Sequence, residues 1–198
     1  PVRSLRRSRA PSPLSDTSIH LAASMDVPCG EGARAHYYTR AAARWAGRLI
    51  EESLLDAKRS SAGGAGKRRL FLVLSLADPH QPYATLPDAA APFAAAAARR
   101  PQSSLRPAGE ALAAVQVGAR KQLQDRAFWE GGRYRDVVAN YLGMVALIDE
   151  ALGELSALAL RVGNSTLTVV NSDHGEMLGA HAQMGKGTMY DGALRAPL

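Results

Sequence analysis

The chain has 198 residues, of which 46% are hydrophobic, so it is long enough to form one domain with a substantial core. Its longest apolar run is strand-sized and falls far short of the roughly 18 residues that a spanning helix needs, which argues against a membrane span within this sequence. The net charge of +6 comes largely from four arginines near the start that no aromatic residues accompany, so we expect no nucleic-acid partner.

Residues 1–35 combine a basic start with several prolines and glycines, and they show no sustained periodicity. This composition predicts an irregular, solvated leader. We therefore expect the folded domain to occupy residues 36–198.

The first expected element is an amphipathic helix from about Tyr37 to about Lys58. Apolar side chains recur there at helical spacing, and most charged residues lie off that stripe. A linker of small residues, 60–66, follows the helix. The apolar stripe consists of Tyr38, Ala42, Trp45, Leu49 and Leu54.

A strand is expected over residues 70–77, where the sequence is almost continuously apolar, as in a parallel strand that is covered on both faces. Asp78 and Pro79 end this run, because proline cannot donate to a sheet ladder and holds the preceding residue extended. His80 should therefore emerge at the carboxyl end of the strand.

Helices are expected next, over the alanine-rich residues 86–100 and over residues 108–126. The clearest helical pattern begins at Tyr134 and keeps its period to Leu158, and Gly163 is a suitable residue to end it. Residues 166–170, which are rich in β-branched side chains, predict a second strand.

This order of helix, strand, helices and strand favours an α/β fold with a parallel sheet. Ligands of such sheets bind beyond the carboxyl ends of the strands. His80 follows the first predicted strand, and Asp173 and His174 follow the second. We therefore expect these polar residues at the same edge of the sheet.

Asp173 and His174 offer a carboxylate oxygen and an imidazole nitrogen, which fit half of a divalent cation site. The alternative is a turn in which Asp173 caps backbone amides. His80, on a rigid strand end, is suited to protonate a leaving group or to bind an oxyanion, although a structural role is the alternative. Lys186 lies between two glycines, where its ammonium can approach sulfate or phosphate oxygens. His181 is a weaker candidate.

Two acidic residues that lie close in sequence to these candidates, Asp78 near His80 and Glu176 near His174, fit simpler roles. Asp78 is better explained as a turn former than as a catalytic acid, because it precedes a proline at a strand end. Glu176 fits a local hydrogen-bonding or solvent-facing role.

Four segments stand in a specific order in the chain: LSLADPHQPY at 74–83, SDHGEMLGAH at 172–181, GKGTMY at 185–190 and LRAPL at 194–198. Together they resemble the sulfatase family, which belongs to the alkaline phosphatase superfamily. Residues 141–155 are similar to the family's helix between these segments. The resemblance covers roughly residues 36–198. It implies part of an alkaline-phosphatase-like sandwich, with a mostly parallel central sheet flanked by helices.

The resemblance also implies roles for single residues. Asp173 and His174 match the family's metal ligands, and His80 and Lys186 match groups that contact the oxygens of the transferred sulfuryl or phosphoryl group. His181 would belong to the substrate pocket. The implied metal is divalent: calcium first, with manganese, zinc or magnesium as alternatives.

The nucleophile side of the family's site has no counterpart in this sequence. The family places a Cys or Ser in a Cys-or-Ser-x-Pro-x-Arg motif and oxidises it to formylglycine, and a paired Asp completes the metal shell. Cys29 has neither the proline two positions on nor the arginine four positions on. We therefore expect the formylglycine nucleophile in a segment outside this sequence, and we expect the isolated chain to be inactive.

The resulting hypothesis is metal-dependent hydrolysis of a sulfate ester, carried by a small molecule or a glycan. A phosphonate or phosphate ester hydrolase of the same superfamily is an alternative, and so is a truncated, inactive relative. The sequence specifies neither oligomeric state nor localisation. For a eukaryotic protein the resemblance implies the secretory pathway, the lysosome or the extracellular space.

Overall fold

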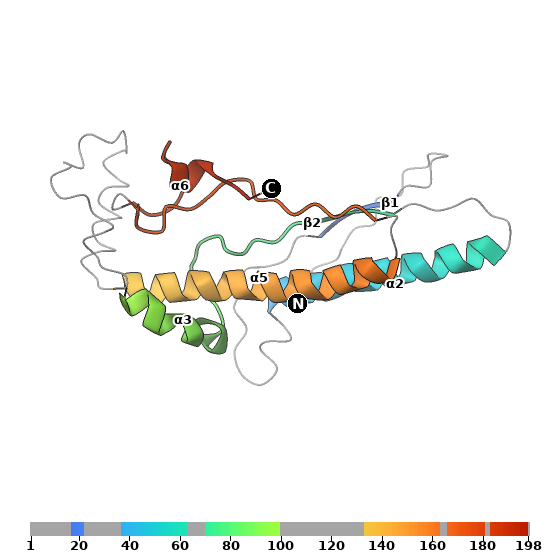
Figure 1. Ribbon diagram of the computed structural model, residues 1–198, viewed down its shortest axis with the longest axis horizontal. Helices are drawn as coiled ribbons and strands as arrows, with labels where there is room; N and C mark the ends of the chain where they lie inside the picture. Colours follow the sequence, from blue (N-terminus) through green and yellow to red (C-terminus); the bar gives the residue numbers. More distant parts are fainter. Residues whose placement is uncertain are drawn as a thin grey trace. The chain divides into compact units, whose positions relative to one another are not determined.

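The computed structural model of the chain describes residues 17–21, 37–62, 70–99, 133–162, 166–180 and 183–197 (Figure 1). The chain divides into two compact units. The first unit comprises residues 1–80 and 144–167, and the second comprises residues 81–143 and 168–198. The predicted helix at 108–126 lies outside the described residues.

A two-stranded parallel sheet belongs to the first unit. Strand β1, Thr17–Leu21, pairs with β2, Leu70–Leu74, so that Thr17 lies opposite Leu70 and Leu21 lies opposite Leu74. The parallel pairing of β2 agrees with the parallel strand that was predicted over residues 70–77. However, β1 lies inside the leader that was expected to be irregular. A strand of five residues gives little local signal when its partner lies some fifty residues further along the chain.

Strand β2 is shorter and more open than its sequence suggests. It ends at Leu74 rather than at residue 77, and the side chain of Phe71 is 60% exposed. The prediction of a strand covered on both faces is therefore wrong for the described residues. Continuous apolar sequence predicts burial only where elements are present to cover both faces.

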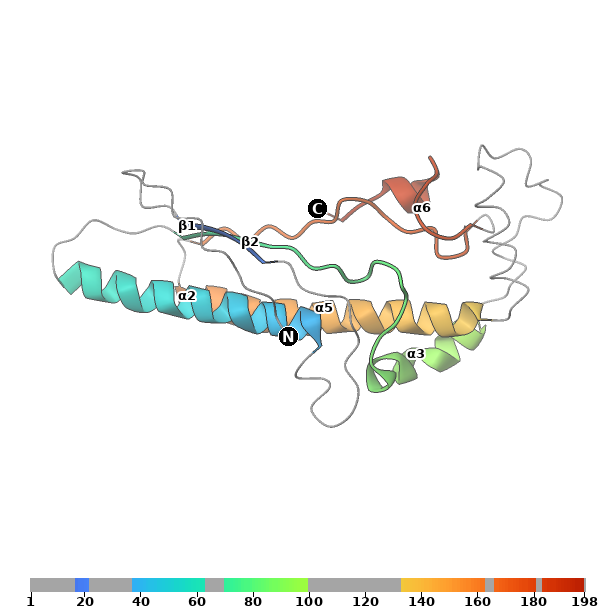
Figure 2. The ribbon, with the colours of Figure 1, turned by 180° about the vertical axis from the view of Figure 1, so that it is seen from behind.

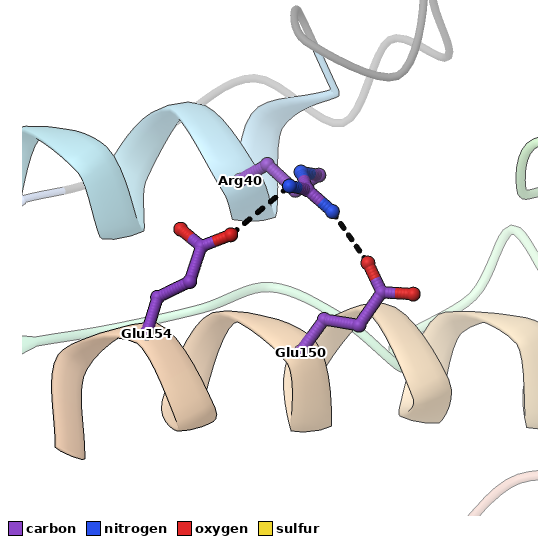
Figure 3. Close-up of polar contacts among 3 residues, drawn as sticks. All are labelled: Arg40, Glu150 and Glu154. Carbon is purple, nitrogen blue, oxygen red and sulfur yellow. Dashed lines mark hydrogen bonds and ion pairs between the residues drawn. The ribbon is translucent and has the colours of Figure 1, made fainter. Parts of the chain in front are cut away.

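Helix α2, Tyr38–Ala62, runs beside the part of α5 that belongs to the same unit, as Figure 2 also shows. Near the start of α2, Arg40 contacts Glu150 and Glu154, and further along α2, Glu51 pairs with Arg161 at 3.5 Å. Later residues of α2 thus contact later residues of α5, so the two helices run in the same direction. Figure 3 shows the Arg40 guanidinium between the two carboxylates of α5.

The buried face of α2 agrees only in part with the predicted apolar stripe. Tyr38 and Ala42 of that stripe are buried, whereas Trp45 is 42% exposed. Ala43 and Ala46, which lie outside the stripe, are also buried. A Cβ built on Gly47 would lie 3.0 Å from Cδ1 of Leu158, so small residues let α5 approach α2 closely. The stripe was predicted from helical spacing, which does not show that small residues form the close contact.

The second unit contains α3, Pro87–Arg99, and the first residues of α5, Tyr134–Val162. These two helices were predicted over residues 86–100 and 134–158, and both predictions are confirmed. Helix α5 extends beyond residue 158, to Val162. A hydrophobic core forms where they meet. It consists of Ala97, Tyr134, Val138 and Ala139, with Phe93, Leu142, Leu178 and Met184 packed against them.

The second predicted strand, at residues 166–170, is not found in the structure. They make no strand pairing within the described part of the chain, and they are exposed along their whole length. A β-branched sequence favours extended backbone, but a strand also needs a neighbour to donate hydrogen bonds. A short helix, α6, Asp191–Leu194, belongs to the second unit. None of the described helices is both long and apolar enough to span a membrane.

Candidate functional site

Asp173 and His174 lie side by side at the surface of the second unit. Nε2 of His174 is 3.4 Å from Oδ2 of Asp173, and Nδ1 of His174 is 2.9 Å from the carbonyl oxygen of Gly175. A carbonyl only accepts, so Nδ1 carries a proton in this contact, and the lone pair that can bind a metal ion is the one on Nε2. A backbone carbonyl commonly orients a metal-binding histidine in this way. The lone pairs of Nε2 and Oδ2 are therefore close enough to bind one cation.

The backbone around this pair is fixed by the segment that includes α6. The amide of Gly175 donates to the carbonyl of Ala193 at 2.8 Å, and the amide of Ser172 donates to that of Pro197 at 3.3 Å. A Cβ on Gly175 would lie 2.2 Å from the carbonyl oxygen of Gly192. Glycine is therefore required here for close backbone approach rather than for flexibility.

Lys186 is half-buried in a loop that closes back onto the same segment. The carboxylate oxygen Oε1 of Glu176 accepts hydrogen bonds from the amides of Leu178 at 3.1 Å and of Gly185 at 2.5 Å. The amide of Met177 in turn donates to the carbonyl of Gly185 at 2.9 Å. Gly185 has a φ of +79°, which glycine adopts readily.

His80 lies in the first unit, in a turn directly after the extended segment that follows β2. Its amide donates to the carbonyl of Ala77 at 2.8 Å, and its side chain is exposed. The turn is anchored by the neighbouring Asp78, whose side chain is only 7% exposed. Oδ1 of Asp78 accepts from the hydroxyl of Tyr37 at 3.1 Å, and Oδ2 accepts from that of Thr39 at 2.6 Å.

Burial raises the pKa of the Asp78 carboxyl above its ordinary value, and the hydrogen bonds from Thr39 and Tyr37 oppose that shift. Burial also raises the pKa of the neighbouring Tyr38 hydroxyl, with a smaller contribution from the charge of Asp78. The predicted turn-forming role of Asp78 thus extends to a buried contact with the first turn of α2.

The structure brings some of the predicted site residues together. Asp173 and His174 are in contact, and the loop of Lys186 is hydrogen-bonded to the segment that follows them. His80 belongs to the other unit, and His181 lies outside the described residues. Within the described ranges, no group of three or more His, Cys, Asp or Glu side chains is placed to hold a metal.

Sequence reasoning did not identify Tyr37 and Thr39 as partners of Asp78. The two residues lie about forty positions before it, so no local pattern connects them. Glu176 was assigned a local hydrogen-bonding role, but its contact with Gly185 spans nine positions. The only signal in the sequence was an acidic residue two positions after His174.

A shallow groove lies on the first unit, between α2 and α5. It has a volume of about 220 Å³, and none of the predicted site residues lines it. Two arginines and two glutamates mix with small and apolar side chains there. The lining residues are Ala43, Arg44, Gly47, Arg48, Glu51, Glu154, Leu155 and Leu158.

Comparison with known proteins gives two findings. The family model described as Sulfatase matches residues 24–198, starting earlier than the motifs indicate. A protein of Trinickia caryophylli named "Multifunctional alkaline phosphatase superfamily protein PehA" is 38% identical over 69 residues, which is 34% of this chain. The matched stretch is 13% of that protein's length, so the chain corresponds to a small part of this relative.

Proposed function

Because the chain belongs to the sulfatase family, we propose that it carries the metal-binding and anion-binding side of a site that hydrolyses sulfate esters. One observation carries this proposal: Nε2 of His174 lies 3.4 Å from Oδ2 of Asp173, and Glu176 connects the segment after them to the loop of Lys186. Cation donors and an anion-binding ammonium are thereby attached to one short stretch of backbone.

The donor set fits a divalent cation. The exposed carboxylate of Asp173 suits calcium or magnesium, and the imidazole of His174 also suits manganese or zinc. We keep calcium as the first candidate, because the family resemblance favours it. A bound cation would supply positive charge to the ester oxygens. Two side chains form only part of a coordination shell, so further ligands would come from elsewhere in the full-length protein.

The roles of the other side chains follow from their chemistry. Lys186 would bind the non-bridging oxygens of the sulfate group and stabilise the charge that develops on them. His80 would donate a proton to the bridging oxygen as the sulfur–oxygen bond breaks and the alcohol leaves. The nucleophile would be a formylglycine hydrate supplied by the full-length protein, since no matching motif occurs in this sequence.

A second candidate is hydrolysis of phosphonate or phosphate esters. The name of the Trinickia caryophylli relative places that protein in the alkaline phosphatase superfamily and calls it multifunctional. Sulfate and phosphate esters present similar tetrahedral oxygens, so the same cation and ammonium serve either. An inactive relative that only binds such anions is a third candidate.

Steady-state kinetics of the full-length protein on an aryl sulfate and an aryl phosphonate, with calcium present, test the proposal. We expect a higher kcat/KM on the sulfate, and we expect His174→Ala to lower both kcat/KM and the amount of bound metal. Asp191→Ala is the matched control, because that exposed carboxylate pairs only with Arg195 in the described structure, at 3.2 Å. A higher kcat/KM on the phosphonate supports the second candidate. Bound metal without turnover of either ester supports the third.

A further inference from the structure

We propose that Glu176 is a positioning residue that sets where Lys186 lies relative to Asp173 and His174. The inference rests on the proposed function of those three residues and concerns how their arrangement is maintained. Glu176 lies two positions after His174, and its carboxylate is hydrogen-bonded to the residue directly before Lys186. It is thus the side chain that connects the two parts of the site.

Both backbone polar groups of Gly185 are engaged by the metal-ligand segment. Its amide donates to Oε1 of Glu176 at 2.5 Å, and its carbonyl accepts from the amide of Met177 at 2.9 Å. On the other side, the carbonyl of Lys186 accepts from the amide of Thr188 at 2.9 Å. The backbone of Lys186 is therefore held on both sides.

The turn that directly follows Glu176 also needs this support, because its backbone is locally unfavourable. Leu178 has a φ of +41°, a left-handed conformation that costs a residue with a side chain about 1–2 kcal/mol. The amide of Leu178 donates to the same oxygen of Glu176, at 3.1 Å, and its carbonyl accepts from the hydroxyl of Tyr134 at 3.1 Å. One carboxylate oxygen thus stabilises the strained turn and the approach of Gly185 together. Hydrogen bonds to a charged acceptor are stronger than neutral ones.

The same contacts argue against a direct chemical role for Glu176. Its oxygen Oε1 already accepts two amide hydrogens. Substitution of Glu176 should therefore act through Lys186, and this separates a positioning role from a general loss of stability.

The affinity of the full-length protein for inorganic sulfate, measured by calorimetry, tests this inference without requiring turnover. We expect Glu176→Ala to weaken sulfate binding about tenfold, as the loss of a charge-assisted contact would. Lys186→Ala should weaken it at least as much. The double variant should bind like Lys186→Ala alone, because Glu176 acts only through that ammonium. Glu176→Gln keeps an acceptor oxygen of the same reach and should stay within about threefold of the wild type.

Control variants keep the outcomes distinct. Asp191→Ala removes an exposed carboxylate from the same unit and should leave sulfate affinity unchanged. If Glu176→Ala does not fold, Glu176→Asp, whose carboxylate is one methylene shorter, should fold and bind sulfate with intermediate affinity. Wild-type affinity in either the Ala or the Asp variant overturns the inference. It is also overturned if the double variant loses sulfate affinity by the product of the losses of Glu176→Ala and Lys186→Ala. Sulfate binding with this coupling but without ester hydrolysis would contradict only the proposed function.

Discussion

The carboxylate of Asp78 is almost completely buried, yet it faces two hydroxyl donors rather than a positive charge. Tyr37 and Thr39 satisfy both of its oxygens, which lowers the cost of burying a charge without removing it. Asp78 stands two positions before His80, so this contact ties the turn of a predicted catalytic residue to the start of α2. A buried carboxyl of this kind should affect how stability depends on pH.

We predict that replacing Asp78 with Asn changes the pH dependence of unfolding. The folded-state pKa of Asp78 lies above the ordinary value of 3.8. Between that value and the raised folded pKa, the folded state binds more protons than the unfolded state, so the unfolding free energy contributed by this group falls as pH rises. Asn cannot ionise and lacks this decline. The advantage of the wild type over Asp78→Asn should therefore shrink as urea denaturation is repeated from about pH 4 towards neutrality. An advantage that grows with pH would contradict the assignment.

Gly175 is a second single residue with a definite structural requirement. An added Cβ would meet the carbonyl oxygens of Gly192 at 2.2 Å and of Arg195 at 2.7 Å, which are backbone atoms that cannot rotate away. Gly175→Ala should therefore lower the unfolding free energy by about 1–3 kcal/mol and weaken calcium binding by the full-length protein. Urea denaturation and calorimetry measure the two effects. Gly187→Ala is the control, because its Cβ would meet nothing within 4 Å. Equal effects of both substitutions would disprove the close-approach explanation.

At the level of elements, helix α5 carries two glycines whose surroundings differ. A Cβ on Gly143 would lie 2.9 Å from the backbone carbon of Ala89, at α3, and 2.9 Å from Cγ2 of Thr85. A Cβ on Gly153 would meet nothing within 4 Å. The first glycine therefore allows close packing within the second unit, whereas the second only lowers the helix propensity of its segment.

The two glycines should respond to alanine with opposite signs. Gly153→Ala should raise the unfolding free energy by about 0.5–1 kcal/mol, because alanine favours the helix. Gly143→Ala gains the same propensity but forces α3 away, so a net loss of about 1–2 kcal/mol is expected. Thermal and urea denaturation of both variants provide the comparison. Stabilisation by Gly143→Ala would show that α3 does not pack against this position.

These elements also show what the sequence can predict. Helices α2 and α5 were predicted from helical periodicity and α3 from its alanine-rich composition, and each of these is a local signal that the segment carries by itself. The partner of β2, the small-residue contact at Gly47 and the hydroxyl donors to Asp78 all join residues far apart in the chain, so local patterns contain no information on them. Gly143 and Gly153 illustrate the same limit, since their sequence context alone does not distinguish them.

The candidate site was predictable to a similar extent. Asp173, His174 and Lys186 stood out because rare combinations of residue types follow an apolar run, and the family motifs strengthened that hypothesis. Their support was not predictable, because it comes from the backbone of residues 192–197 and from the bonds of Glu176 to a loop. Residue type identifies candidate ligands, but only the fold shows what orients them.

At the level of the whole molecule, residues 166–170 affect how the chain should behave in solution. Their side chains are exposed, with Leu167 at 88%, Val169 at 65% and Val170 at 50%. The backbone there forms no ladder with another described segment. An apolar, β-branched stretch with free backbone groups is a template for pairing with another chain.

We therefore predict that this 198-residue chain self-associates as its concentration rises, and that Val169→Lys weakens the association. A charge on the exposed face opposes edge-to-edge pairing and should cost little stability. Leu160→Lys is the matched control: that side chain is 82% exposed, but it lies on the helix α5 and not on an extended segment. Sedimentation velocity at several concentrations should show fewer oligomers for Val169→Lys and wild-type behaviour for Leu160→Lys. If Leu160→Lys reduced association as strongly, exposed apolar area in general would be responsible, and the unpaired backbone at 166–170 would not be the cause.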